Sequence, residues 1–118
     1  MTSTSGATDP LLTPFKLGNR TAKNRIFSSG HALSHAVHGR ATETTLRYQM
    51  EKAKGGIGLS FVGGSGTVSI DTAPVFDQLI IDDDIIPFFS ELSDFYHQHD
   101  ALLMTQITHL GRRTNANA

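Results

Sequence analysis

The length and composition of this chain are those of one globular domain, because 118 residues with 38% hydrophobic side chains can bury a core. Its 10 basic and 11 acidic residues give a formal net charge of -1, so neither nucleic acid nor a membrane surface is an expected partner. Cysteine is absent, which excludes disulfides, thiolate nucleophiles and cysteine-ligated metals within these residues and permits a reducing compartment.

The first ten residues, Met1–Pro10, are small and polar and lack the apolar stretch of a secretion signal. No later run reaches the ~18 apolar residues that a membrane span needs. We therefore expect residues 1–10 to be a disordered leader, residues 11–118 to form the folded domain, and the protein to be cytoplasmic.

A β-hairpin and a strand are predicted first. The partly apolar runs Leu11–Lys16 and Thr21–Phe27 flank Leu17-Gly18-Asn19-Arg20, whose Gly and Asn favour a hairpin turn. A strand follows at Arg25-Ile26-Phe27-Ser28-Ser29. It stops at Gly30, where the missing Cβ lets the backbone bend or approach a ligand closely.

The first helix follows a polar loop. Thr42 is a suitable N-cap, and Leu46, Met50 and Ala53 recur at the spacing of one helix face. Gly55-Gly56 ends the segment as a C-cap would. We expect a helix of ordinary length between these signals.

A buried strand is predicted over Ile57–Val62, ending abruptly at Gly63-Gly64-Ser65-Gly66. A long connection then runs through Asp71, Pro74 and Asp77.

A second helix should begin near Asp84, since Pro87 is tolerated in a first turn. Its expected face consists of Ile85, Phe88, Leu92, Phe95 and His99. The last strand is expected over Ala101–Ile107.

This order of elements predicts an α/β fold with parallel strands joined by right-handed crossovers. It fits an open doubly wound sheet or the start of a closed barrel. A dinucleotide-binding unit would carry G-x-G-x-x-G after its first strand, but Gly30 is followed there by His31–His38. For Gly63-Gly64-x-Gly66, a tight turn and a phosphate cradle both remain open.

In a barrel the carboxyl ends of the strands would meet at one rim and form the active site. The strand-end segments Ser29-Gly30-His31, Gly63-Gly64 and Gln106-Ile107-Thr108-His109 would then lie together. This convergence is the main functional inference from the pattern of elements.

Four motifs, in this order, are similar to those of the old yellow enzyme family. They are Lys23-Asn24-Arg25-Ile26, Ser28-Ser29-Gly30-His31, Gly63-Gly64 and Gln106-Ile107-Thr108-His109-Leu110-Gly111-Arg112. The chain resembles the branch that contains 2,4-dienoyl-CoA reductase and trimethylamine dehydrogenase, from Leu11 to its end. The resemblance implies the N-terminal portion, about three βα units plus a hairpin, of an FMN-binding (β/α)8 TIM barrel.

The resemblance also implies which residues contact FMN: Ser29, Gly30, His31, Ala32, Gly63, Gly64 and Gln106. Glycines suit a flat isoalloxazine ring, and Gln106 can donate and accept hydrogen bonds along its pyrimidine edge. Ala32 departs from relatives that have Cys or Thr there, so redox tuning by that side chain does not carry over.

Other polar residues leave alternatives open. His31 could contact flavin or substrate in catalysis, or only brace its loop, and no other catalytic residue is assigned in this segment. His109 and Arg112 could bind an anion or brace their loop. The remaining histidines lack the spacing of a ligand set, so no metal is expected. They are His35, His38, His97 and His99.

For the intact parent, the resemblance implies that NAD(P)H reduces FMN and that flavin N5 passes hydride to an activated alkene. An amine-oxidising parent is the alternative within this branch, and an iron-sulfur cluster would lie in the missing C-terminal part. Two further hypotheses are a small subunit that completes a barrel with a second chain, and the start of a non-flavin barrel such as an aldolase. The expected protein partner is such a complementing chain or another copy of this chain in a homo-oligomer. The 118-residue chain alone is expected to be inactive.

Overall fold

The structure is a computed structural model that describes residues 9–69 and 79–113. Residues 1–8 of the expected leader, the connection through Asp71, Pro74 and Asp77, and residues 114–118 lie outside the described residues. The elements in chain order are η1 (Pro10–Leu12), β1 (Phe15–Leu17), β2 (Arg20–Ala22), β3 (Phe27–Ser28), α2 (Glu43–Lys54), β4 (Leu59–Thr67), β5 (Leu79–Ile80), η2 (Asp83–Ile85), α3 (Ile86–Gln98), β6 (Leu102–Ile107) and η3 (Gly111–Arg113).

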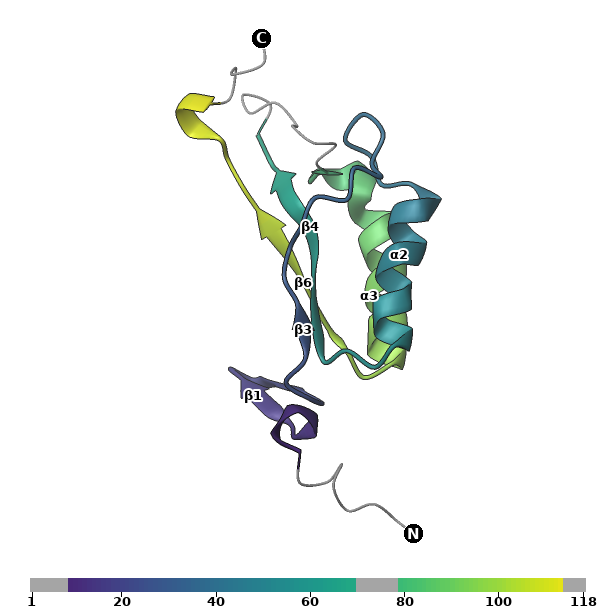
Figure 1. The fold of residues 1–118 in the computed structure, drawn as a ribbon. Coiled ribbons are helices and arrows are strands. Elements are labelled where there is room, and N and C mark those ends of the chain that lie inside the picture. Colours follow the sequence, from purple (N-terminus) through teal and green to yellow (C-terminus); the bar gives the residue numbers. More distant parts are fainter. Residues whose placement is uncertain (1–8, 70–78, 114–118) are drawn as a thin grey trace.

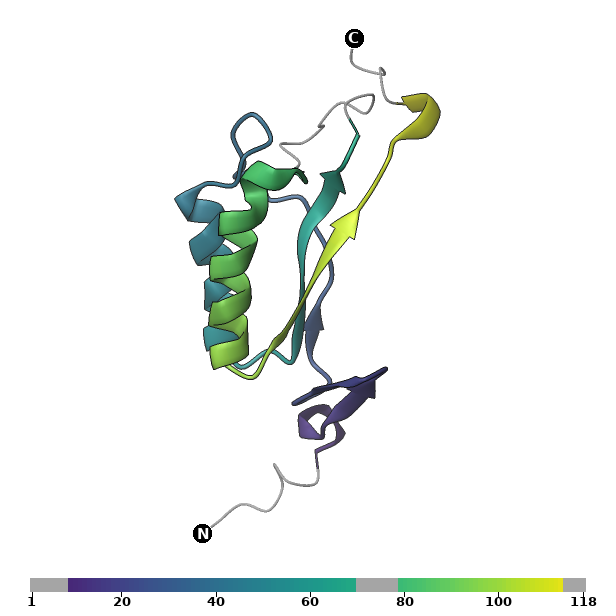
Figure 2. The ribbon, with the colours of Figure 1, turned by 180° about the vertical axis from the view of Figure 1, so that it is seen from behind.

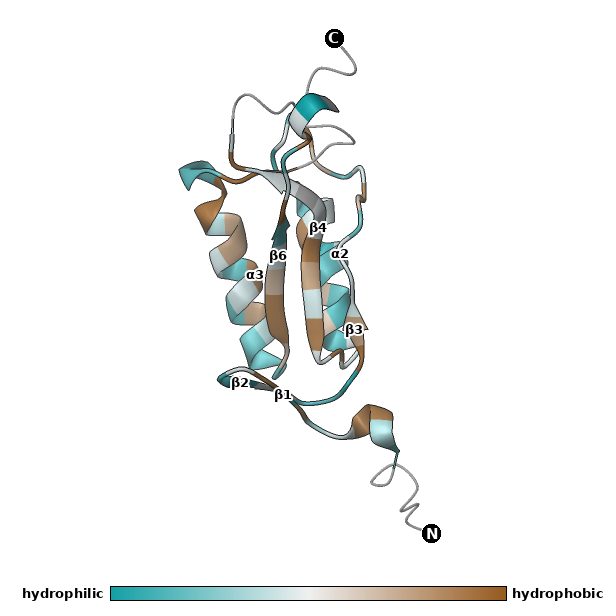
Figure 3. Ribbon diagram, turned by 90° about the vertical axis from the view of Figure 1, so that its left-hand side faces the viewer, coloured by the Kyte–Doolittle hydropathy of each residue, from teal (hydrophilic) through white to brown (hydrophobic). Residues whose placement is uncertain are grey.

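A parallel sheet is built around β4, which pairs with β3, β5 and β6. This confirms the predicted parallel strands. Helices α2 and α3 lie side by side on one face of the sheet (Figures 1 and 2). Figure 3 shows the mainly apolar colouring of β4 and β6. The elements therefore form two layers, with helices on one side of the sheet only.

The core lies between the two helices and the sheet. Its buried residues are Ala36, Leu46, Ala53, Val62, Leu79, Ile85, Leu92, Tyr96 and Ala101. The hydroxyl of Tyr96 donates to the Gln49 carbonyl at 2.8 Å, which ties α3 to α2. Burial raises the pKa of Tyr96, since a phenolate in this layer would lose its hydration.

The signals at the ends of the elements act largely as expected. Thr42 caps α2 by accepting from the backbone N–H of Thr45, and Gly55 is the C-cap. Pro87 lies in the first turn of α3. The hairpin turns at Gly18, whose φ of +60° favours glycine. Neither α2 nor α3, nor any other helix among the described residues, is long and apolar enough to cross a membrane.

The prediction that the second strand stops at Gly63 is wrong, because β4 continues to Thr67. Pairing with β6 shifts register between Val62↔Thr105 and Gly66↔Ile107, so four steps along β4 match two along β6. Gly63 has a φ of +74°, which absorbs part of this bulge. Beyond the bulge, β4 gains β5 as a further partner at Gly66↔Leu79.

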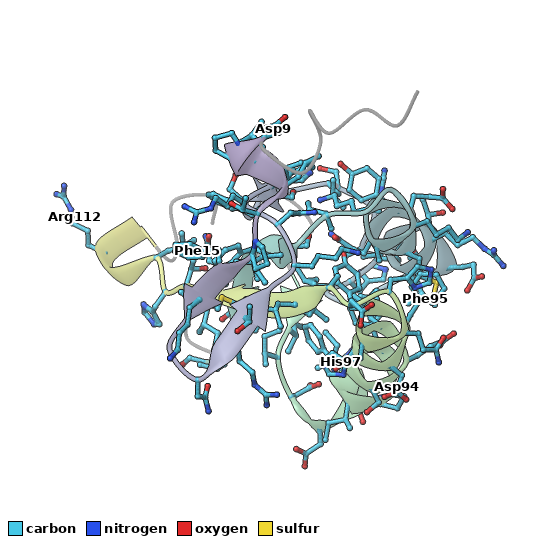
Figure 4. The ribbon with its side chains drawn as sticks, turned by 90° about the horizontal axis from the view of Figure 1, so that it is seen from below. Asp9, Phe15, Asp94, Phe95, His97 and Arg112 are labelled. Carbon is cyan, nitrogen blue, oxygen red and sulfur yellow. The ribbon has the colours of Figure 1, made fainter. Side chains whose placement is uncertain are left out.

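An apolar cavity of about 440 Å³ lies at the end of the sheet where β4 begins, away from the bulge. It is bounded by the hairpin and by the sheet face that the helices leave bare. Its lining includes Phe15, Ile26, Phe27, Phe61 and Met104. Figure 4, which views the molecule from below, shows the hairpin with Phe15 lying across this end. The hairpin therefore lies at the end opposite to the carboxyl ends of the strands.

Candidate functional site

The three predicted strand ends meet at the carboxyl edge of the sheet. The side-chain amide of Gln106, near the end of β6, donates through Nε2 to the carbonyl of Gly64 on β4. A Cβ placed on Gly30, after β3, would lie 2.6 Å from the Gly63 carbonyl oxygen and 2.9 Å from Oε1 of Gln106. The structure thus confirms the convergence inferred from the order of elements.

The backbone that follows β3 approaches the backbone of β4 closely at Gly64. A Cβ on Gly64 would lie 2.4 Å from the backbone nitrogen of Ala32 and 2.7 Å from the carbonyl carbon of His31. Contacts this short leave no room for a side chain. Packing between strand ends therefore requires glycine at Gly30 and Gly64, which is a different reason from the flat ring considered for the sequence.

The imidazole of His31 is held at both ring nitrogens. Nδ1 lies 3.1 Å from the Ser29 carbonyl oxygen, and Nε2 lies 2.9 Å from the hydroxyl of Tyr48 on α2. The two rings pack edge to face with centroids 5.9 Å apart. Ser29, His31 and Ala32 are all exposed in the described part of the chain.

Lys52, one turn further along α2, reaches the last residue of β3, just before this loop. Its Nζ donates to the Ser28 hydroxyl at 2.9 Å and lies 4.8 Å from the centre of the Tyr48 ring. Partial burial lowers the pKa of Lys52. Sequence reasoning missed both Tyr48 and Lys52, although their i, i+4 spacing places them on one helix face.

The loop after β6 is braced by a contact within it and by a contact with β4. His109 accepts through Nδ1 from the backbone N–H of Gly111 at 2.9 Å, and Thr108 donates its backbone N–H to the Gly66 carbonyl at 2.8 Å. Arg112 is exposed and projects away from the other elements (Figure 4). Within residues 9–69 and 79–113, no group of three or more His, Asp or Glu residues is placed to hold a metal ion.

Comparison with known proteins places the site in a family context. Residues 10–118 match the NADH:flavin oxidoreductase / NADH oxidase family. The chain is 44% identical over 96% of its length to a multifunctional alkene reductase/demethylase from Caballeronia cordobensis, of which it covers 17%. It is 46% identical over 92% of its length to an N,N-dimethylglycine/sarcosine dehydrogenase from Chromohalobacter salexigens, of which it covers 16%.

Solved structures agree. The chain superposes on the old yellow enzyme from Trypanosoma cruzi with a TM-score of 0.77 and 27% identity, covering 92% of this chain and 29% of that one. The fold is therefore the expected α/β portion of a TIM barrel, and the chain spans about a sixth of the length of the two curated relatives. The chain belongs to the NADH:flavin oxidoreductase / NADH oxidase family.

Proposed function

We propose that this chain supplies the flavin-ring contacts of an NAD(P)H-dependent FMN oxidoreductase that reduces activated alkenes. Family membership supports the cofactor, and the convergence of the strand ends supports the location. The observation that carries the proposal is the placement of the Gln106 amide between the ends of β3 and β4.

Gln106 is suited to hold a flavin pyrimidine edge. A glutamine amide has two N–H donors and one carbonyl acceptor. Donating one N–H to the Gly64 carbonyl fixes the orientation of the group and leaves capacity for a donor and an acceptor contact. The residue is exposed at the rim, where a ligand can reach it.

The remaining contacts would come from the backbone of Ser29, Gly30, His31, Ala32, Gly63 and Gly64. The chemistry that bound FMN supplies is hydride transfer from NAD(P)H to the alkene. The part of these residues is to bind and orient the ring at the rim. An imidazole at His31 also stands beside the place where a substrate would approach.

Amine oxidation is the second candidate, because the dimethylglycine/sarcosine dehydrogenase is as similar to this chain as the alkene reductase/demethylase is, at 46% against 44% identity. An iron-sulfur cluster, the phosphate site and the proton donor would all lie outside these residues. The rest of the barrel would cover the bare sheet face, on the same polypeptide or on a complementing chain, and we place the enzyme in the cytoplasm.

The test is Gln106→Leu in the full-length flavoprotein. Loss of the amide leaves polar atoms of the bound ring unpaired, at a cost of about 1–3 kcal/mol, or roughly 5- to 150-fold in FMN affinity. Gln98→Leu, on the exposed end of α3, is the matched control and should leave FMN binding unchanged. Unchanged affinity, spectrum and potential in Gln106→Leu would contradict the assignment.

The same preparation separates the two candidate reactions. With NADH or NADPH under anaerobic conditions, loss of an enone such as 2-cyclohexenone supports alkene reduction. Reduction of a dye by dimethylglycine without any enone turnover would instead favour amine oxidation.

A further inference from the structure

Helix α2 and its N-cap hold the end of β3 and the loop that follows it at three points. Lys52 contacts Ser28 at 2.9 Å, Tyr48 contacts His31 at 2.9 Å, and the Thr42 hydroxyl donates to the His35 carbonyl at 2.7 Å. Successive points on the loop meet successive points along the helix toward its N-terminus. The loop that bears four of the proposed flavin contacts is therefore attached to a helix outside the site.

The central contact determines the protonation pattern of His31. A carbonyl oxygen only accepts hydrogen bonds, so the 3.1 Å contact with Ser29 requires a proton on Nδ1 of the imidazole. In the neutral ring Nε2 must then accept, and the hydroxyl of Tyr48 at 2.9 Å is the donor. Both ring nitrogens are therefore engaged, one by the loop itself and one by α2.

The backbone beside His31 has little freedom to shift. Its carbonyl carbon and the nitrogen of Ala32 lie within 2.7 Å of where a Cβ of Gly64 would be. Gly64 in turn accepts from Gln106. A contact that fixes the His31 ring also fixes the backbone beside it, which packs against Gly64. Because Gly64 is bonded to Gln106, the same contact sets the spacing between the end of β3 and Gln106.

We propose that Tyr48 is a positioning residue for the flavin site: its hydroxyl locks His31 in the Nδ1–H tautomer and so holds the main chain of Gly30–Ala32 against Gly64. Lys52 supports this arrangement, because its ammonium group lies 4.8 Å from the centre of the Tyr48 ring and bonds Ser28 below it. The expected effect on flavin binding rests on the function proposed above, whereas the assignment of the His31 tautomer rests only on its two contacts.

The experiment compares Tyr48→Phe with Tyr96→Phe in the full-length protein. Both changes remove one phenolic hydroxyl, but that of Tyr96 is buried between α2 and α3 and donates to the Gln49 carbonyl, whereas that of Tyr48 contacts His31. Histidine labelled with ¹⁵N reports the tautomer, and His31→Gln assigns its signals. FMN affinity and the flavin potential are measured on wild type, Tyr48→Phe and Tyr96→Phe.

In wild type and in Tyr96→Phe, His31 should show the Nδ1–H tautomer, with and without FMN. In Tyr48→Phe the Nε2–H form should appear, and FMN should bind roughly 2- to 10-fold more weakly, as for the loss of one hydrogen bond. The retained aromatic ring keeps the packing, and the thermal midpoint checks that the variant is folded.

A wild-type His31 in the Nε2–H form, or a Tyr48→Phe protein with unchanged tautomer and FMN affinity, would overturn the proposal. A wild-type protein with the expected tautomer but without affinity for FMN would support the tautomer assignment and overturn the proposed function. The two failures are therefore distinguishable.

Discussion

At the scale of single residues, the sequence draws attention to Gly30 and Gly64 but does not reveal how they pack. The expected reason for Gly30 and Gly64 was contact with a flat ring. In the structure each glycine lies where another strand end leaves no space for a Cβ. Such contacts join residues more than 30 positions apart, so no local pattern could have predicted them.

The first prediction concerns Gly64→Ala. Its Cβ would lie 2.4 Å from the Ala32 nitrogen, which is backbone and can yield only if the loop shifts. We expect a stability loss of about 1–3 kcal/mol and FMN binding weakened by more than about tenfold. Thermal unfolding and flavin fluorescence titration measure the two effects.

Gly55→Ala is the matched control for this change. Gly55 has a φ of -70°, and a Cβ there would come no closer than 3.4 Å to the backbone of α2. It should therefore leave both measurements near the wild-type values. Equal behaviour of the two variants would show that the packing of the strand ends is looser than described.

At the scale of elements, α2 was predicted well and β4 less well, for a physical reason. The cap at Thr42 and the spacing of Leu46 and Ala53 are local signals, and they set the helix directly. The continuation of β4 to Thr67 depends instead on hydrogen bonds to β5 and β6. The glycines Gly63 and Gly64 predict the end of the strand in the sequence, but pairing with β5 and β6 extends β4 beyond them.

Tyr48 and Lys52 were missed for a related reason. A Tyr and a Lys on a helix face are ordinary in a sequence, and only the fold brings that face against the loop after β3. The convergence of the strand-end residues was predictable because the ends of parallel strands share one rim in this fold. No comparable rule predicts from a sequence which residues of a neighbouring helix will contact the strand ends.

The second prediction concerns the ion pair that links two connections beside α2. Arg40 donates from Nη1 and Nη2 to the carboxylate of Asp82 at 2.5 and 2.7 Å. This guanidinium holds the pKa of Asp82 below its ordinary value of 3.8. The contribution to stability is therefore present above about pH 4 and is lost as pH falls through the lowered pKa.

Asp82→Asn should accordingly lower the thermal midpoint slightly at pH 7, since both side chains are exposed and the pair is screened. The difference from wild type should begin to shrink below about pH 4, where Asp82 of the unfolded chain becomes protonated, and should vanish once pH falls below the lowered pKa of folded Asp82. Asp94→Asn, an exposed carboxylate on α3, is the control and should show no such trend. A difference that stays constant from pH 7 to pH 3 would contradict the linkage.

At the scale of the whole molecule, the described residues form an incomplete layer structure. Helices cover one face of the sheet, while Phe27 on the other side is 62% exposed and Ile26 is 43% exposed. Those side chains line the apolar cavity beneath the hairpin, together with Met104. In a closed barrel this face would be the interior, which explains its apolar character.

The last prediction is that residues 1–118 expressed alone will neither hold FMN tightly nor reduce an enone. The strand edges and the bare apolar face would drive self-association, and the fragment would lack the phosphate anchor that the resemblance places elsewhere in the barrel. Light scattering, flavin quenching and NADH-dependent enone loss measure these properties. Phe27→Lys separates the two causes, because a charge on the exposed face should restore solubility without restoring flavin binding. Tight stoichiometric quenching with turnover by the soluble fragment would contradict the prediction, because the rim described here would then be sufficient to bind FMN without the rest of a barrel.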